Sequence, residues 1–357
     1  MKLLFLFNFL LFFIPILKAQ NTDFKPQVDS IVNMKMKEYK IPGISISVVK
    51  NGEIIYTKGY GVKEIGTDQK VTEHSVFHTA SVSKLLTAQA VMQLVEDGKI
   101  SLEDRLVDLL TSLNYSDKKV EQISLKSLLN HTSGLPDIQN YHWENNHQED
   151  NSLSEYILNL KLKTKFPPKT EYKYSNLGYD ILGLIVEQKS ELLFEDYVAE
   201  TILKPIGMAE SDFRYFKISG ELSVKPHTKK GSKIVVRNTY PYTREHAPSS
   251  TLNASAYDLS KWMIFFLQQL QKGKNSFYAQ MQNPSTEVYA HIGLGFQIFE
   301  IDGHKVIGHF GGDKGFRSLL LMVPEKNIGV VVLGNCDYEE DYRQEILKPV
   351  IKMIINN

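Results

Sequence analysis

Hydrophobic and polar residues alternate in short runs near both ends of the chain. Residues 44–48 read Ile-Ser-Ile-Ser-Val, a period of two that is typical of a β-strand. Asn51 and Gly52 follow, the pair that most strongly favours a tight hairpin, so residues 53–60 are predicted to return as the partner strand. The same pattern recurs before the C-terminus and predicts strands over residues 297–301, 304–307, 318–323 and 328–333.

The middle of the chain follows a helical period instead. Between about residues 84 and 271, apolar residues recur every three or four positions in several stretches, the first of which ends at Gly98. Helices are predicted over residues 28–39, 151–162, 177–188, 251–271 and 338–355, with a further helix start at 101–104 and a kink or restart at Pro349. Polar stretches at residues 141–150 and 219–250 show no pattern.

Strands at both ends with helices between them predict an α+β fold. We expect one antiparallel β-sheet formed from both chain ends and flanked by helices. A mainly helical lobe is expected to be inserted into it at about residues 84–271. With 357 residues the chain is too long for one small hydrophobic core. Two closely connected lobes are therefore expected.

The N-terminus carries an apolar run over residues 3–17, preceded by Lys2 and interrupted by Asn8 and Pro15. It is short for a membrane span and predicts a signal peptide over residues 1–19, leaving 20–357 as the mature domain. The alternative is an uncleaved anchor. A cleaved signal predicts an exported protein, periplasmic or extracellular, with no membrane span in the mature chain.

Charge and cysteine content narrow the functional classes. The 41 basic and 41 acidic residues balance, which gives no electrostatic footprint for nucleic acid. One cysteine, Cys336, cannot form an internal disulfide, so stability is expected to come from an ordinary core. The oligomeric state is not indicated by the sequence.

The first candidate catalytic residues are Ser81 and Lys84, which lie three residues apart at the start of a predicted helix. This spacing places both side chains on one helix face. A buried lysine shifts toward its neutral form and can then take the serine proton. The pair alone is weak evidence, because such tetrads arise by chance.

Two later motifs complete the candidate site. Residues 174–176, Tyr-Ser-Asn, precede a predicted helix, where a phenolate at Tyr174 stabilised by a lysine can act as general base and later as acid. The alternative is an ordinary helix cap. Residues 309–312, His-Phe-Gly-Gly, end a predicted strand whose glycines allow close approach of a ligand. The alternative is a strand end with a surface histidine.

In this order the three motifs resemble those of the serine β-lactamase and penicillin-binding-protein superfamily. The chain is most similar to the class C β-lactamase and DD-peptidase branch, which also contains family VIII-type esterases and D-amino-acid peptidases. The resemblance extends from Gly43 to Leu333. It includes further matching stretches at residues 131–135, 205–208, 293–296 and 315–318.

The resemblance implies a role for each motif residue. Ser81 is the acylated nucleophile, Lys84 and Tyr174 relay its proton, and the backbone N–H groups of Ser81 and Gly312 form the oxyanion hole. The implied substrate-binding residues are Asn176, His309, Phe310, Gly311 and Arg317.

One departure bears on specificity. Many β-lactamases carry Lys-Thr-Gly where this chain has His309, Phe310 and Gly311. The lysine charge and the hydroxyl that help hold a substrate carboxylate are both replaced, and Phe310 is expected to offer an apolar wall. Arg317 either supplies the missing charge or is a surface residue. A poor β-lactamase is therefore expected.

The resulting interpretation is an exported serine hydrolase that acts through an acyl-enzyme on amide or ester bonds of small molecules or peptides. D-amino-acid peptides and simple esters are the alternatives for its substrate, and a slow-deacylating or non-catalytic penicillin-binding sensor is the alternative function. No metal or cofactor is expected, because His142, Glu144 and His147 lie in a polar loop without a ligand motif.

Overall fold

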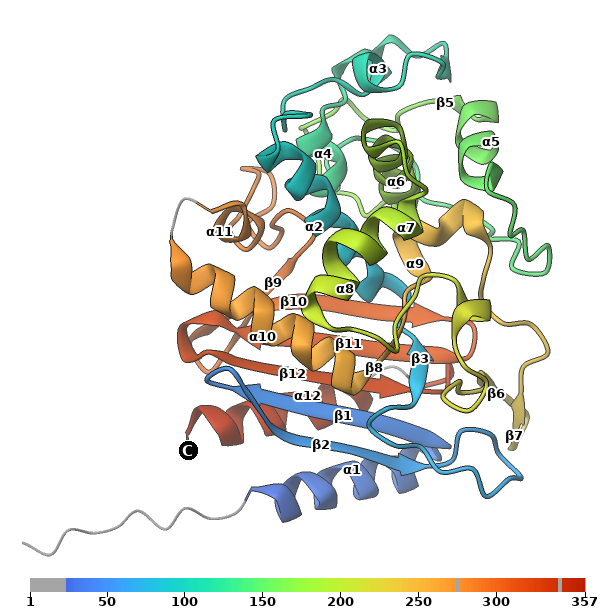
Figure 1. Ribbon diagram of the computed structural model, residues 1–357, viewed down its shortest axis with the longest axis vertical. Helices are drawn as coiled ribbons and strands as arrows, with labels where there is room; N and C mark the ends of the chain where they lie inside the picture. Colours follow the sequence, from blue (N-terminus) through green and yellow to red (C-terminus); the bar gives the residue numbers. More distant parts are fainter. Residues whose placement is uncertain (1–23, 274–275, 340–341, 357) are drawn as a thin grey trace, which may run out of the picture.

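The structure is a computed structural model that describes residues 24–273, 276–339 and 342–356. A six-stranded antiparallel sheet with the order β2-β1-β12-β11-β10-β9 forms its lower half (Figure 1). The strands are β1 (Gly43–Lys50), β2 (Glu53–Gly61), β9 (Gln297–Ile301), β10 (His304–Asp313), β11 (Phe316–Val323) and β12 (Ile328–Gly334). The sheet built from both chain ends is thus confirmed, and the predicted signal peptide lies outside the described residues.

Hairpin turns set the register of the sheet. Asn51 and Gly52 both have positive φ, 53° and 83°, as a type I′ turn requires, and they join β1 to β2. Asp302 and Gly303 repeat this geometry between β9 and β10. The two halves of the sheet meet where β1 pairs with β12, from Ile44 opposite Gly334 to Lys50 opposite Ile328.

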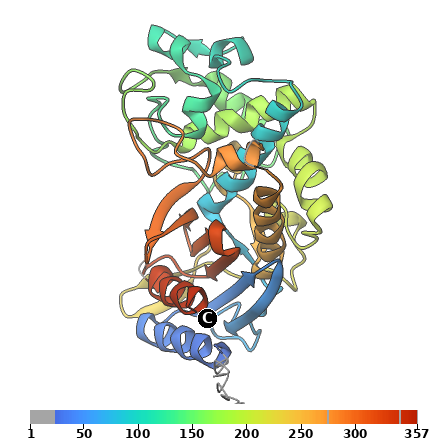
Figure 2. The same cartoon turned by 90° about the vertical axis from the view of Figure 1, so that its left-hand side faces the viewer.

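Helices cover both faces of the sheet (Figure 2). The helices α1 (Lys25–Tyr39) and α12 (Tyr342–Ile355) pack on one face, and α10 (Ala256–Lys272) packs on the other. The serines that alternate along β1 are therefore buried rather than solvent-exposed. Ser47 accepts a 2.6 Å hydrogen bond from Ser260 of α10.

The inserted lobe contains the remaining helices and lies above the sheet in Figure 1. They are α2 (Ser83–Glu96), α3 (Leu106–Leu109), α4 (Leu125–Leu129), α5 (Ser152–Asn159), α6 (Asn176–Ser190), α7 (Phe194–Val198), α8 (Lys204–Ile206), α9 (Ala247–Ser250) and α11 (Phe277–Met281). The predicted boundary near residue 271 needs correction, because α10 packs on β1 and β12. Gly329 of β12 has no side chain, which lets Met263 of α10 lie directly against the strand.

Three pairs of short strands lie outside the six-stranded sheet. They are β3 (Val76–His78), which pairs with β8 (Asn253–Ser255), the pair β4 (Asn114–Tyr115) and β5 (Lys161–Leu162), and the hairpin β6 (His227–Lys230) and β7 (Lys233–Val236). The β6–β7 hairpin lies in a stretch for which the sequence showed no pattern. Residues 101–104 form a turn rather than a helix start.

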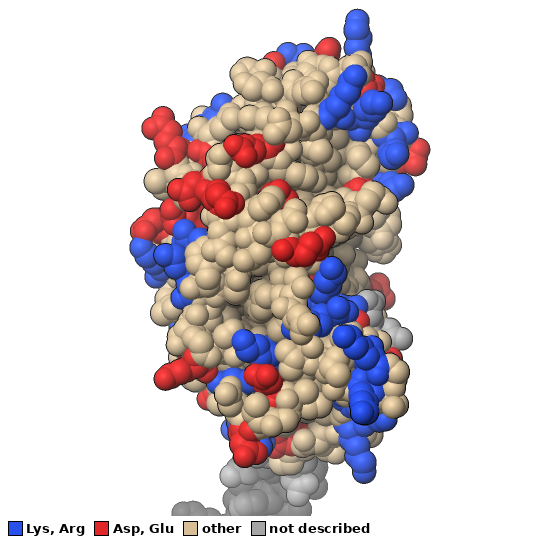
Figure 3. Space-filling view, turned by 90° about the vertical axis from the view of Figure 1, so that its right-hand side faces the viewer, with Lys and Arg blue, Asp and Glu red and all other residues tan. Residues whose placement is uncertain are grey.

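Charged side chains of both signs lie on the face of the molecule that Figure 3 draws. Figure 3 shows that positive side chains gather along one edge of this face, whereas acidic ones lie across its middle, so the face carries both signs. Across the described residues, no helix is both long and apolar enough to cross a bilayer.

Candidate active site

Ser81 lies in a tight turn between β3 and α2. It belongs to the 3₁₀ turn η1 (Ala80–Val82), which runs directly into α2 at Ser83, so Ser81 lies at the N-terminus of the helix where it was expected. Ala80 has a φ of 49°, a left-handed conformation that costs free energy for a residue with a Cβ. Such strained positions cluster at functional sites.

Lys84 is completely buried behind the serine. Its Nζ donates to Ser81 Oγ at 3.2 Å, to Asn176 Oδ1 at 2.6 Å and to the carbonyl of Ser249 at 2.6 Å. Burial lowers the pKa of Lys84 to about 7, although nearby aspartates oppose the shift. A substantial fraction is therefore neutral near pH 7 and can accept a proton.

Tyr174 completes the nucleophile's surroundings. Its hydroxyl interacts with Ser81, and its ring centroid lies 5.0 Å from Lys84 Nζ. The His131 ring packs against it at 4.4 Å. Burial raises the pKa of Tyr174 well above 10, and the contact with Ser81 only partly offsets this. This direction favours Lys84 over a Tyr174 phenolate as the base, and the phenolate role of Tyr174 stays a prediction.

Asn176, the first residue of α6, links Lys84 to an aspartate that the sequence analysis missed. Its Oδ1 accepts from Lys84, while its Nδ2 and backbone N donate to Asp137 Oδ1 at 2.9 and 2.8 Å. Ser175 caps α6 by accepting from Gly178 N. Asp137 therefore orients the amide, and within the described residues the other Nδ2 hydrogen has no acceptor, which leaves it for a substrate carbonyl.

The strand β10 forms the opposite wall of the site. A Cβ on Gly311 would lie 2.2 Å from the carbonyl oxygen of Thr79 and 2.1 Å from Ser318 Oγ. The nucleophile turn can approach the strand this closely only because residue 311 is a glycine. Ser318 on β11 also donates to the Thr79 carbonyl at 2.6 Å, which holds the turn against the sheet.

The backbone of β10 places the N–H of Gly312 at the free edge. Beyond Gly308, β10 has no pairing with β9, and Phe310 N donates instead to the side chain of Gln297 at 3.2 Å. Alternate N–H groups of a strand point the same way. The N–H of Gly312 therefore points to this open edge, as an oxyanion donor beside Ser81 requires.

His309 lies on the face of β10 that Gly311 presents to Ser81. Its ring is 6.0 Å from that of Tyr174, and its Nδ1 lies 2.5 Å from the Phe310 carbonyl. Burial lowers the pKa of His309 to about 3, and the charge of Lys84 adds to the effect. The imidazole is therefore neutral. Its buried Nε2 has no hydrogen-bond partner among the described residues.

Two of the predicted substrate-binding side chains lie elsewhere. Phe310 faces the other side of the sheet, where it packs 5.6 Å from Phe299 and 5.2 Å from the Arg343 guanidinium. Arg317 lies beside Gly312 on that side and donates to the backbone carbonyls of Asp313, Phe316 and Asp337. Successive strand residues point to opposite faces, so Phe310 cannot share a wall with His309.

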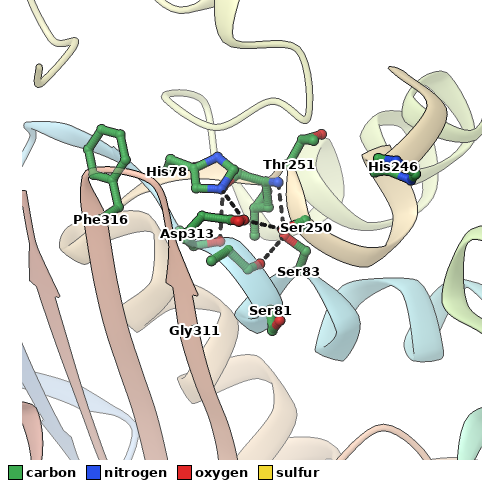
Figure 4. A network of polar contacts seen from close by, with 12 residues as sticks. His78, Ser81, Ser83, His246, Ser250, Thr251, Gly311, Asp313 and Phe316 are labelled. Carbon is green, nitrogen blue, oxygen red and sulfur yellow. Dashed lines mark hydrogen bonds and ion pairs between the residues drawn. The ribbon is translucent and has the colours of Figure 1, made fainter. Parts of the chain in front are cut away.

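A second missed group lies at the end of β10. Asp313 accepts hydrogen bonds from His78 and Ser250 close to the nucleophile turn (Figure 4). Polar residues scattered over three segments carry no common spacing, so only the fold brings them together.

The histidines of the polar loop at residues 141–150 pair with carboxylates. His142 pairs with Glu144 and His147 with Glu245, and the described residues contain no cluster of three metal-ligand side chains.

Known proteins resemble this chain over most of its length. The family model described as Beta-lactamase matches residues 28–349. Protein flp of Staphylococcus aureus (strain NCTC 8325 / PS 47) is 29% identical over 344 residues, covering 94% of this chain and 67% of that protein. Penicillin-binding protein 4* of Bacillus subtilis (strain 168) is 24% identical over 325 residues, covering 85% and 70%.

Solved structures share the fold. The octameric penicillin-binding protein homologue from Pyrococcus abyssi superposes with a TM-score of 0.80 at 25% identity, covering 93% of this chain and 78% of that one. The D-amino acid amidase from Ochrobactrum anthropi SV3 gives 0.78 at 18% identity, covering 94% and 99%. With the matched family model spanning most of its length and a serine–lysine pair in contact, this chain belongs to the Beta-lactamase family.

Proposed function

We propose that this chain is an exported serine hydrolase that cleaves amide or ester bonds of small molecules or peptides through an acyl-enzyme. The observation that carries the proposal is the contact between Lys84 Nζ and Ser81 Oγ at 3.2 Å. A lysine whose pKa is lowered to about 7 is poised to take the serine proton near neutral pH.

Acylation begins when Ser81 Oγ attacks the substrate carbonyl carbon and its proton passes to neutral Lys84. The carbonyl oxygen becomes an oxyanion that the N–H groups of Ser81 and Gly312 stabilise. When the oxyanion collapses, the bond to the amine or alcohol breaks. The leaving group takes the proton of the Tyr174 hydroxyl, which Lys84 then restores.

Deacylation repeats this sequence of proton transfers with water as the nucleophile. Water gives a proton to Lys84 as its oxygen attacks the acyl carbon, and Ser81 leaves with a proton from the same relay. The product is a carboxylic acid, and the enzyme returns to its starting state. Each step thus uses one proton path, in which Lys84 accepts and Tyr174 donates.

Amino-acid-derived substrates are favoured within this class. A penicillin-binding protein and a D-amino acid amidase appear, by name, among the similar proteins. The neutral His309 and the outward Arg317 leave the β10 wall without the positive charge that would attract a β-lactam carboxylate. Export is proposed from the apolar N-terminal run at residues 3–17.

Labelling with a fluorophosphonate followed by mass spectrometry tests the proposal. The adduct is expected on Ser81, lost in Ser81→Ala and kept in Ser112→Ala, which changes an exposed serine. Unchanged labelling of Ser81→Ala would sink the assignment. A fluorescent penicillin that stays bound without turnover of ester or amide substrates would favour the slow-deacylating sensor instead.

A further inference from the structure

Asp313 ends β10 on the same face as His309 and Gly311, because residues two apart in a strand share a face. It lies about 7 Å along the strand from Gly311, which touches the nucleophile turn. His309 occupies the opposite end of this row, near Tyr174. The row thus has a neutral end beside Tyr174 and a carboxylate at its other end.

The carboxylate of Asp313 is held in a fixed orientation. His78 Nε2 lies 2.9 Å from Oδ2, and the hydroxyl of Ser250 donates to the same oxygen (Figure 4). The His78 side chain is fully buried, whereas that of Asp313 is 10% exposed. Oδ1 accepts no hydrogen bond from any residue in the described ranges, so one oxygen stays available to a ligand.

The hydrogen bonds to the Asp313 carboxylate go to one of its two oxygens. The buried Nδ1 of His78 has no hydrogen-bond partner in the described part of the chain, so Nε2 is the ring atom that holds the Asp313 carboxylate. Lys84 already donates to Ser81 Oγ, Asn176 Oδ1 and the carbonyl of Ser249. Asp137 differs from Asp313 because its carboxylate holds Asn176 in place.

The row consists of His309, Gly311 and Asp313. The proposed proton transfers decide which end of this row faces the leaving group and which end faces the acyl part of the substrate. The leaving group must lie within reach of the Tyr174 hydroxyl, at the His309 end. The substituent on the other side of the carbonyl then extends along β10 past Gly312. That direction leads to Asp313 and Ser250, so the acyl part of the substrate meets the carboxylate.

We propose that Asp313 is a specificity-determining residue that binds a cationic amino group on the acyl part of the substrate. The substrate class is then amides, peptides or esters of amino acids with a free amino group. The inference rests on the proposed acyl-enzyme function of Ser81. A hydrogen bond between charged partners corresponds to a preference of about tenfold to a hundredfold.

The test compares molecules that differ only in the amino group. Alanine p-nitroanilide, in both enantiomers, is measured against propionyl p-nitroanilide at pH about 7, where an α-amino group with a pKa near 7.7–8 is mostly protonated. Protection of Ser81 from fluorophosphonate by alaninamide and by propionamide gives a second readout that needs no turnover. The favoured alanyl enantiomer should exceed the propionyl compound at least tenfold in kcat/KM, and alaninamide should protect at a correspondingly lower concentration.

Asp313→Asn keeps a side-chain oxygen that can accept from His78 and Ser250. The variant should reduce the kcat/KM preference for the alanyl compound, and the protection preference for alaninamide, to less than about threefold. Glu144→Gln is the matched control, because it removes an exposed carboxylate that interacts with Lys314, the neighbour of Asp313. Equal handling of the two compounds by the unaltered enzyme, or an equal collapse in Glu144→Gln, overturns the inference. Failure of the fluorophosphonate to label Ser81 would overturn the proposed function itself.

Discussion

The ammonium nitrogen of Lys84 lies 5.0 Å from the centre of the Tyr174 ring, and both groups contact the hydroxyl of Ser81. The same buried environment shifts them in opposite senses. Burial lowers the pKa of Lys84 to about 7 and raises that of Tyr174 well above 10. Near neutral pH the pair therefore offers a proton acceptor and a proton donor, which is the arrangement that the proposed acylation requires.

The pH dependence of acylation should follow Lys84. Below about pH 7 the ammonium form cannot take the serine proton, so kcat/KM for a neutral ester should rise about tenfold per pH unit and level off above about pH 7. Stopped-flow measurement of p-nitrophenyl butyrate acylation checks this. Lys84→Arg, whose side chain stays charged, should show no rising limb. A flat profile through neutrality in the unaltered enzyme would exclude Lys84 as the base.

Lys84 and Tyr174 should behave as one proton-transfer unit. Lys84→Met or Tyr174→Phe is expected to reduce the acylation rate by something like 10²–10⁴-fold each, the usual scale for acid–base catalysis. Because both serve the same step, the double variant should lose little more than the worse single variant. A double variant whose loss equals the product of the two single losses contradicts the shared role.

The contact between Gly311 and the nucleophile turn should be intolerant of a side chain. In Gly311→Ala the new methyl group would lie 2.2 Å from the Thr79 carbonyl oxygen, so the turn that carries Ser81 must move away. Fluorophosphonate labelling should slow by at least about tenfold, equivalent to about 1.4 kcal/mol in the barrier. Gly220→Ala, in open space on an exposed turn, is the control. Unchanged labelling of Gly311→Ala would contradict the geometry.

Nitrocefin should be a poor substrate beside p-nitrophenyl butyrate and a D-alanyl dipeptide amide, compared by kcat/KM. The reason is the missing cation on the β10 wall, where His309 has a pKa lowered to about 3. Phe310→Thr, which installs the hydroxyl residue of many β-lactamases, should leave this ranking unchanged because Phe310 packs against Phe299 on the other face.

The effect of Phe310→Thr should instead appear in stability. Losing the contacts with Phe299 and Arg343 is expected to reduce the free energy of unfolding by about 1–2 kcal/mol, measured by urea denaturation. A gain in nitrocefin turnover without loss of stability would show that the side chain reaches the substrate.

Local signals explain why much of the fold was predictable. The Asn51–Gly52 and Asp302–Gly303 turns specify hairpins through residues that accept positive φ, and the strands beside them are strongly apolar. The hairpin of β6 and β7 was missed because it is short, rich in lysine and half exposed, and so carries no clear alternation. The position of α10 on the sheet depends on tertiary contacts that no local pattern encodes.

In the candidate site, too, local motifs were predictable and contacts between distant residues were not. The motifs led to Ser81, Lys84 and Tyr174, which the structure brings together. Phe310 was misplaced, although neighbouring residues of a strand point to opposite faces and His309 already occupied the site face. Asp137 and Asp313 were missed because each is defined by a partner far away in sequence, Asn176 and His78 respectively. Single-sequence patterns do not report such pairs.

The pairing of β1 with β12 also determines when the sheet can assemble during synthesis of the chain. A chain that emerges N-terminus first presents the β1–β2 hairpin with an unpaired edge until β12 arrives, nearly the whole sequence later. The β10 strand that forms the wall beside Ser81 is synthesised equally late. Removing the C-terminal residues should therefore yield a chain whose first strands have no partner to close against, rather than a shortened enzyme.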